Sequence, residues 1–191
     1  MSKRVLITGA FGQLGDAVII ELQPHFELCA TGCVLPDDSY QFCQQAVMDV
    51  TVKNQVAECI EHFSPDVVVH LASMTDVDGC ELNREKAWNT NVHGTENILN
   101  CLRGSDAKMV FISTDYVFDG TAGPYSEEDI PKPVNYYGKS KLASENSIRG
   151  SNQPWVILRT NVLYGNSSKN LASFVNWVVS SLREEKEINV V

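Results

Sequence analysis

A tyrosine and a lysine four positions apart, Tyr137 and Lys141, are the residues whose types and spacing most directly suggest chemistry. On a helix their side chains lie on one face, about one turn apart. A phenol can donate a proton to a substrate, and a neighbouring ammonium favours the phenolate and lowers the phenol's pKa. Such a pair reduces a carbonyl only if another group delivers hydride. Tyr136 is the competing acid, but the lysine four residues further on favours Tyr137.

A glycine-rich turn near the start of the chain is suited to holding a hydride carrier. Gly9, Gly12 and Gly15 follow an apolar, β-branched segment and precede a helical pattern. In a dinucleotide site the first glycine permits a tight turn, the second lets the backbone approach the pyrophosphate, and the third permits close helix–strand packing. The spacing has one residue more than G-x-G-x-x-G, and such a turn alone is also compatible with plain architecture. Together with Tyr137 and Lys141, it predicts a nicotinamide-dependent oxidoreductase.

Short apolar segments alternate with helical patterns, which predicts an α/β fold. The predicted strands are residues 3–8, 26–31, 45–50, 66–72, 108–113 and 155–159, and another begins at 188–191. The predicted helices are residues 12–23, 51–63 (capped by Thr51), 85–103, 136–149 and 170–186, and residues 119–134 form a surface loop. This order predicts a Rossmann-like, doubly wound parallel sheet in a three-layer α/β/α arrangement, with ligands at the carboxyl ends of the strands.

Polar residues follow the predicted strands, where one site would form. Ser113, Thr114 and Asp115 come after the fifth strand, and a hydroxyl there can hydrogen-bond a substrate carbonyl, although such clusters also form turns. Asp49, before Val50, could accept from an adenine amino group or cap the following helix. We therefore predict a single active site at this edge of the sheet.

The end of the second strand bears on the choice of cofactor. An acidic residue there binds the ribose 2′-hydroxyl of NAD, and an arginine accommodates the 2′-phosphate of NADP. Residues 29–33 (CATGC) contain neither. No carboxylate there repels a 2′-phosphate and Thr31 could donate to one, and these two features together favour NADP slightly. The alternative is that Thr31 and Cys33 are loop residues and that both cofactors bind.

Composition excludes several other classes of protein. At 191 residues the chain has room for one domain, and its net charge of −9 argues against nucleic-acid binding. It has neither an apolar run of about 18 residues nor a signal sequence, so we expect a cytoplasmic protein without a membrane span. Its six cysteines lack CxxC spacing and its four histidines do not converge, so we expect reduced, mostly buried thiols and no metal site.

Several motifs together resemble the extended short-chain dehydrogenase/reductases. They are Thr8-Gly9-x-x-Gly12-x-x-Gly15, Asn91-Val92-x-Gly94-Thr95, Ser113-Thr114 and Tyr137-x-x-x-Lys141. Within that family the chain is most similar to dTDP-4-dehydrorhamnose reductases, through residues 65–72 (PDVVVHLA), 113–120 (STDYVFDG) and 135–142 (NYYGKSKL). It is also similar to the regulatory β subunit of methionine adenosyltransferase. The alternatives to a reductase are therefore a regulatory, cofactor-binding subunit and a nucleotide-sugar epimerase or dehydratase.

The resemblance implies reduction of the 4-keto group of a dTDP-sugar, with NADP or NAD as cofactor. It implies four catalytic residues, namely Thr114, Tyr137, Lys141 and, as a proton relay or merely a helix residue, Asn91. It implies a substrate side formed by Thr75, Val77, Asp115 and Tyr116. The expected cofactor-binding residues are Gly9, Phe11, Gly12, Gln13, Leu14, Gly15, Thr31, Asp49, Val50, Leu71, Ala72, Ser73, Ser113, Tyr137, Lys141, Asn161 and Val162.

The resemblance also bears on domain organisation. Residues 1–191 correspond to the NAD(P)-binding domain, and the family continues into a C-terminal lobe that helps hold the sugar nucleotide. We therefore expect this lobe to be missing or truncated here. Extended members often pair, so the oligomer that the resemblance implies is a homodimer.

Overall fold

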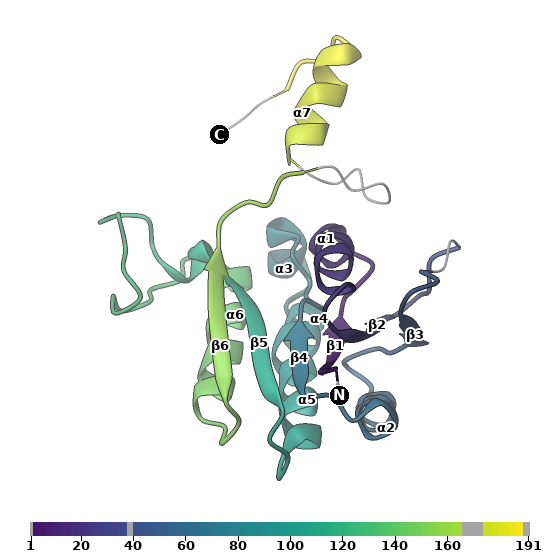
Figure 1. Cartoon of the computed structure of the whole chain (residues 1–191). Coiled ribbons are helices and arrows are strands. Elements are labelled where there is room, and N and C mark those ends of the chain that lie inside the picture. Colours follow the sequence, from purple (N-terminus) through teal and green to yellow (C-terminus); the bar gives the residue numbers. More distant parts are fainter. Residues whose placement is uncertain (1, 38–39, 166–173, 189–191) are drawn as a thin grey trace.

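One parallel sheet forms the centre of the structure, a computed structural model that describes residues 2–37, 40–165 and 174–188 (Figure 1). Its strand order is β3-β2-β1-β4-β5-β6. The strands are β1 (Arg4–Thr8), β2 (Glu27–Gly32), β3 (Gln44–Val47), β4 (Val67–His70), β5 (Lys108–Thr114) and β6 (Trp155–Thr160). All neighbouring strands run parallel, so the predicted Rossmann-like fold is confirmed.

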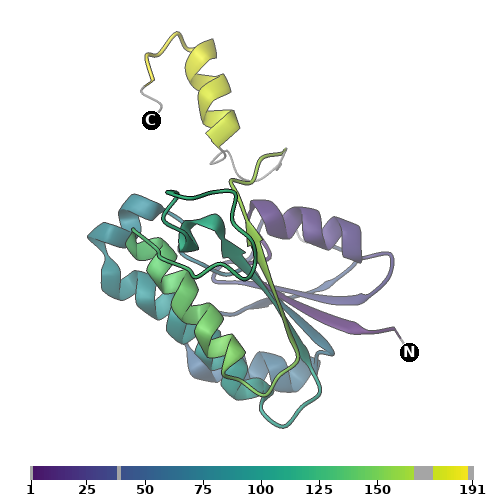
Figure 2. The same ribbon diagram turned by 90° about the vertical axis from the view of Figure 1, so that its left-hand side faces the viewer.

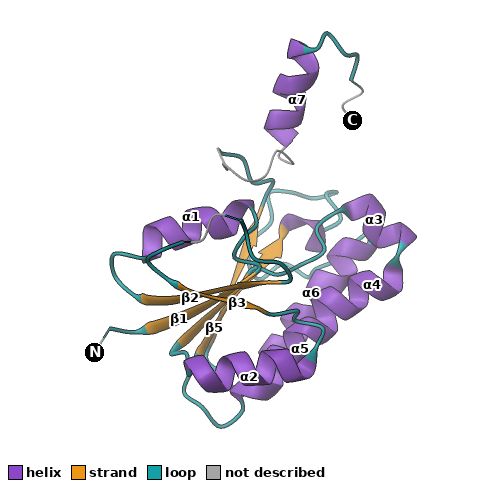
Figure 3. Cartoon of the chain, turned by 90° about the vertical axis from the view of Figure 1, so that its right-hand side faces the viewer, coloured by secondary structure: helices purple, strands orange, loops and turns teal. Residues whose placement is uncertain are grey.

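Helices cover both faces of the sheet, and the strands are apolar on both sides for that reason. In β1, Val5 and Ile7 pack with Ile19 of α1 (Gln13–Leu22), whereas Leu6 belongs to the cluster on the opposite face. That second face is covered by α2 (Lys53–Phe63), α5 (Gly94–Leu102) and α6 (Tyr136–Arg149). Figure 3 shows α1 on one side of the strands and these three helices on the other. The sheet and the helices on its two faces therefore form the predicted three-layer arrangement.

The first glycine of the turn after β1 has a conformation that favours glycine. Gly9 has φ +64°, and a Cβ there would lie 2.6 Å from the Ala72 nitrogen. Gly15 allows a different close approach, because a Cβ on it would collide with the carbonyl of Ala10. A Cβ on Gly12 would meet only the Gly9 carbonyl, at 3.4 Å, so the space beside Gly12 is open. Two of the three glycines are thus required by the fold, whereas the second is not.

The stretch predicted as one helix over residues 85–103 contains three helical elements in succession. They are α4 (Arg84–Trp88), a π-helical turn (Asn89–His93) and α5. A π turn adds a residue to the helix and is frequent at functional sites. The helix before α4 is α3 (Val77–Leu82), which the sequence analysis did not predict. Asp76 caps α3 by accepting a hydrogen bond from the Gly79 nitrogen.

Thr51 does not cap α2, so that prediction was wrong. The cap position is Val52, and the Thr51 hydroxyl donates instead to the Asp49 carboxylate at 2.8 Å. The same carboxylate oxygen accepts from the Thr51 backbone nitrogen at 2.9 Å. Asp49 therefore closes the turn before the helix, and since β3 ends at Val47, Asp49 lies just beyond the strand.

The C-terminal part of the described chain is α7 (Phe174–Arg183), which stands apart from the sheet and its helical layers (Figure 2). Of the predicted helix over 170–186, residues 170–173 lie outside the described residues. Of the strand predicted at 188–191, only Ile188 is described, and it is not in a strand. Among the described residues, no helix combines the length and apolar character needed to cross a membrane.

The cysteines only partly match the expectation of buried thiols. All six are free, but only Cys29 and Cys80 are buried, while Cys33 is exposed. The described residues contain no group of three or more His, Cys, Asp and Glu side chains able to hold a metal ion.

The glycine turn yields a stability prediction. Gly15→Ala forces a methyl group against the Ala10 carbonyl and should lower the free energy of unfolding by about 1–3 kcal/mol, the usual cost of overpacking. Gly12→Ala, the matched control, should leave it within about 0.5 kcal/mol. Urea denaturation measures both, and equal losses would contradict the distinction between the two glycines.

Candidate active site

A cleft of about 1330 Å³ lies where the strands of the sheet end. It is lined by the segments that follow all six strands, β1 to β6, as expected for a parallel sheet. Most residues predicted for the site line it, namely Gly9, Phe11, Gly12, Gln13, Leu14, Gly15, Asp49, Val50, Leu71, Ala72, Ser73, Thr75, Val77, Ser113, Thr114, Asp115, Tyr116, Tyr137, Lys141, Asn161 and Val162. The predicted residues outside this lining are Thr31 and Asn91.

The turn after β1 fits the pyrophosphate of a dinucleotide. Gly12 is the cap residue of α1, and no described side chain caps that helix end. The N-terminus of a helix favours an anion, because its first backbone N–H groups point outward and the helix dipole is positive there. The open space beside Gly12 would admit a phosphate close to the backbone. The residues present therefore fit the group that the sequence predicts.

Thr31 cannot act as the ligand of a 2′-phosphate, which corrects that prediction. Its side chain is fully buried and its hydroxyl donates to the Ile7 carbonyl at 3.0 Å. Thr31 pairs with Thr8 in the middle of the sheet, so its hydroxyl stabilises the β1–β2 pair. The weak preference for NADP therefore loses one of its two grounds, the Thr31 hydroxyl.

Tyr137 lies against the end of β5. Burial raises the pKa of its phenol to about 12, and the smaller influence of the Thr114 hydroxyl lowers it. The start of α6 can approach so closely because position 138 is glycine: a Cβ there would collide with the Tyr116 carbonyl. The phenol therefore keeps its proton across the neutral range and can donate it.

Lys141 does not lower the pKa of Tyr137 in this structure, contrary to the prediction. Its ammonium lies 4.1 Å from the centre of the Phe111 ring and the side chain is buried. Burial lowers the pKa of Lys141 to about 7, although the charge of Glu145 opposes this shift. The influences on the Tyr137 pKa are burial, Thr114 and neighbouring thiol, carboxyl and phenol groups. The lysine is therefore only partly charged near neutral pH.

The start of α6 is fixed by two groups that the sequence analysis missed or left aside. The Asn135 side chain caps the helix by accepting from the Gly138 nitrogen at 2.7 Å. The Glu81 carboxylate, on α3, accepts from the Tyr136 nitrogen at 2.6 Å. Tyr136 is held through its own backbone, which leaves Tyr137 directed at Thr114. The signal for Glu81 was present in the sequence, because a carboxylate near a helix start is favourable.

The Asn91 side chain crosslinks two segments of the site, and its role as a proton relay stays a prediction. Its side-chain oxygen accepts from the Ser73 hydroxyl and the Met74 nitrogen, at 3.0 and 2.7 Å. Its amide donates to the Met74 carbonyl and to the Ser140 hydroxyl, at 3.2 and 2.8 Å. All four hydrogen-bonding positions of the amide are used, and the residue is buried. Asn91 therefore ties the loop after β4 to α6.

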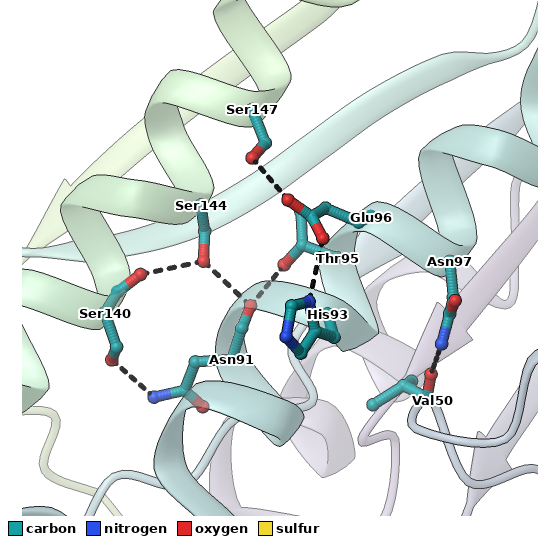
Figure 4. A network of polar contacts seen from close by, with 9 residues as sticks. All are labelled: Val50, Asn91, His93, Thr95, Glu96, Asn97, Ser140, Ser144 and Ser147. Carbon is teal, nitrogen blue, oxygen red and sulfur yellow. Dashed lines mark hydrogen bonds and ion pairs between the residues drawn. The ribbon is translucent and has the colours of Figure 1, made fainter. Parts of the chain in front are cut away.

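The Asn91 backbone extends this network (Figure 4). Its carbonyl, in the π turn, accepts from the Thr95 hydroxyl at 2.6 Å and from the Ser144 hydroxyl at 2.7 Å. Figure 4 also shows Glu96 and Ser147 joined across the same helix pair. The helix that carries Tyr137 and Lys141 is thus held to α5 and the π turn by polar contacts along its length.

His70 continues the network to the glycine turn, and its tautomer follows from its partners. Since the Thr95 hydroxyl donates to Asn91, it must accept from Nε2 of His70, 3.1 Å away. Burial lowers the pKa of His70 to about 3, so the ring is neutral and Nδ1 accepts from the Thr8 hydroxyl at 2.7 Å. Thr8 in turn accepts from the Ala72 nitrogen. The role of His70 is therefore structural.

An ion pair fixes the last strand behind the site. The buried Glu145 carboxylate accepts from Nε and Nη2 of Arg159, at 2.9 and 2.7 Å, and also pairs with Arg149. Burial alone would raise the pKa of Glu145, but the hydrogen bonds from Arg159 and the charges of both arginines hold it below its usual value. This bidentate contact joins α6 to β6, and no sequence pattern indicated it.

Several residues line the cleft without having been predicted. Four of these residues are polar and lie on α4 or directly beside it, namely Asn83, Lys86, Asn89 and Thr90. Their spacing of about one helical turn was the signal that could have identified them.

Comparison with known proteins agrees with this geometry. Residues 3–191 match the family described as RmlD substrate binding domain. The chain belongs to this family. Because the family lies within the extended short-chain dehydrogenase/reductases, the resemblance read from the motifs is confirmed.

Individual relatives differ in their described roles. The chain is 41% identical over 164 residues to methionine adenosyltransferase 2 subunit beta of Bos taurus, covering 86% of this chain and 48% of that one. It is 35% identical over 179 residues to a probable low-salt glycan biosynthesis reductase of Haloferax volcanii, covering 92% and 59%. The chain spans about half the length of the curated relatives it matches.

The fold is shared with a solved enzyme. The dTDP-4-dehydrorhamnose reductase of Bacillus anthracis, in complex with NADP, superposes with a TM-score of 0.84 at 34% identity, over 98% of this chain and 62% of that one.

Burial of Lys141 predicts a pH-dependent stability. The folded pKa of about 7 lies below the unfolded value of 10.5, so between these pH values the unfolded chain holds a proton that the folded chain lacks. The stability of the protein should therefore rise across this window. Lys141→Met should be more stable than the parent at pH 6, by a margin that shrinks toward pH 10.

Urea denaturation at several pH values measures this margin. Lys139→Met, which removes the same charge from an exposed position of α6, is the control and should show no such trend. A margin for Lys141→Met that does not change with pH would contradict the burial of a titrating ammonium.

Proposed function

We propose that this protein reduces the 4-keto group of a dTDP-sugar, with a reduced nicotinamide dinucleotide as the hydride source. The single observation that supports this most strongly is that Tyr137 and Thr114 line the same cleft as the glycine turn. A proton donor, a second hydroxyl and a pyrophosphate-binding turn in one cleft match the requirements of carbonyl reduction. Family membership supports the reductase class, and the choice of sugar rests on similarity to dTDP-4-dehydrorhamnose reductases.

The chemistry is divided among three side chains. Tyr137, whose pKa of about 12 keeps it protonated near neutral pH, donates its proton to the carbonyl oxygen as negative charge develops there. The Thr114 hydroxyl hydrogen-bonds the same oxygen and stabilises that charge. Lys141, one helical turn from Tyr137, is assigned to the nicotinamide ribose, where a charged ammonium would favour the phenolate. The dinucleotide, when bound, supplies the hydride.

Substrate and cofactor positions follow from the cleft lining. Thr75, Val77, Asp115 and Tyr116 line the cleft beside the catalytic pair, and we propose that they face the sugar. Asn161 and Val162, after β6, are assigned to the nicotinamide end. The Thr114 hydroxyl donates its one proton to the Asp115 carboxylate at 3.1 Å, so it must turn away from Asp115 to donate to the substrate oxygen.

Tyr137→Phe tests the assignment of the proton donor. In full-length protein supplied with dTDP-4-keto-rhamnose and either NADPH or NADH, oxidation of the nicotinamide should be measurable by its absorbance. The variant should lose about 10²–10⁴-fold in kcat, since a positioned acid contributes that much, while dinucleotide affinity is largely kept.

Tyr136→Phe is the matched control, because it removes the adjacent phenol and keeps the backbone bond to Glu81. It should retain the rate within a few fold. Full activity of Tyr137→Phe, or equal losses in both variants, would show that Tyr137 is not the acid.

A regulatory role is the second candidate, favoured by the 41% identity to methionine adenosyltransferase 2 subunit beta. In that case the cleft would bind a dinucleotide and the protein would act by association. Co-purification with a methionine adenosyltransferase catalytic subunit, together with no ketosugar turnover, would support this role. Turnover without such association supports the reductase.

A further inference from the structure

The inference concerns the adenosine end of the cleft, and it rests on the proposed function. Thr114 and Tyr137 lie at β5, on one side of β1, and the glycine turn follows β1 itself. A dinucleotide whose nicotinamide meets Tyr137 and whose pyrophosphate meets Gly12 must place its adenosine beyond β1, over the ends of β2 and β3. The cleft is lined there by Gly32, Cys33 and Asp49, with their immediate neighbours.

Among the described residues that line this end of the cleft, none is basic. From residue 27 to residue 52 the sequence contains neither lysine nor arginine, whereas Glu27, Asp37, Asp38 and Asp49 are acidic. Cys33 and Val34, both exposed, stand where an arginine would have to reach a 2′-phosphate. The buried Thr31 hydroxyl donates to the Ile7 carbonyl, so it cannot bind a 2′-phosphate in place of an arginine.

The Asp49 carboxylate adds negative charge to the same corner. Burial and then the charge of Asp49 raise the pKa of the Cys33 thiol, which places the carboxylate near Cys33. One oxygen of Asp49 accepts both hydrogen bonds from Thr51, which fixes the carboxylate at the turn. A phosphate brought close to it would be repelled.

The cations of the cleft lie elsewhere. Among the described lining residues these are Lys86 and Lys141. Lys141 is buried on α6 over Phe111, and Lys86 is exposed on α4, which packs against α3 and α6.

We propose that this cleft selects NAD(H) over NADP(H), and that the uncharged end of β2 together with the Asp49 carboxylate is the cause. A 2′-hydroxyl can be accommodated beside a carboxylate because it can donate to it. A 2′-phosphate would lose water without gaining a cation, and burying an unpaired charge is costly. The expected selectivity is the reverse of the slight NADP preference inferred from the sequence.

Calorimetric titration with NAD⁺ and NADP⁺, without substrate, measures the selectivity. The parent protein should bind NAD⁺ at least about tenfold more tightly, which corresponds to about 1.4 kcal/mol. Cys33→Arg supplies the missing guanidinium and should shift the ratio of the two dissociation constants toward NADP⁺ by about tenfold. Ile20→Arg adds the same charge at an exposed position of α1 outside the cleft lining and should leave the ratio unchanged.

The outcomes separate this inference from the function on which it rests. Equal or tighter binding of NADP⁺ to the parent overturns the selectivity and leaves the proposed reductase standing. An unchanged ratio in Cys33→Arg, or a loss of NADP⁺ affinity alone in Lys86→Met, shows that the adenosine lies elsewhere and overturns the assignment. Binding of neither dinucleotide overturns the inference and the proposed function together.

Discussion

A buried chain of hydrogen bonds joins the three segments that form the cleft, and the geometry of the site depends on it. It runs from Ala72 and Thr8 through His70 and Thr95 to the carbonyl of Asn91. The Thr8 and Thr95 hydroxyls each donate one hydrogen bond and accept another, and each ring nitrogen of His70 has one partner. Buried polar groups of this kind are costly when unpaired and specific when satisfied. The chain therefore fixes the glycine turn, the loop after β4 and the π turn in one arrangement.

The same constraint places α6. Ser140 and Ser144 bond to Asn91, and the Glu145 carboxylate holds Arg159 of β6, so the helix is tied to both of its neighbours. Tyr137 and Lys141 therefore lie on a helix whose position does not depend on a bound ligand. Burial disfavours the charged form of both groups, which leaves the phenol protonated and the lysine only partly charged. In this state Tyr137 holds the proton that it would donate, whereas the partly charged Lys141 does little to favour the phenolate.

The sequence was sufficient for the architecture, because the strands are β-branched runs separated by helical patterns and the glycine turn begins the first such unit. The sequence was insufficient where contacts between distant residues determine the local structure. Helix α3 has only six residues with a glycine among them, so no periodicity marks it. A π turn leaves no pattern distinct from the helix around it. Thr31 was expected to face the cofactor, but pairing with Thr8 directs its hydroxyl into the sheet.

The residues of the site were easier to find than their roles. Glycines, hydroxyls and the Tyr–Lys pair at the ends of strands identify the cleft, because parallel strands bring these ends together. Whether Asn91 relays a proton or crosslinks two segments depends on which partners fill its amide, and those partners are distant in the sequence. The same holds for Lys141, whose charge is set by its burial and by the opposing charge of Glu145.

The central claim is that one cleft brings a nicotinamide dinucleotide to Tyr137 and Thr114. A crystal structure of the protein with bound NAD⁺ tests it most directly. The account predicts density for the pyrophosphate at Gly12 and for the nicotinamide beside Tyr137, with the adenosine over Cys33 and Asp49. A dinucleotide bound in the opposite direction, or outside this cleft, would contradict it.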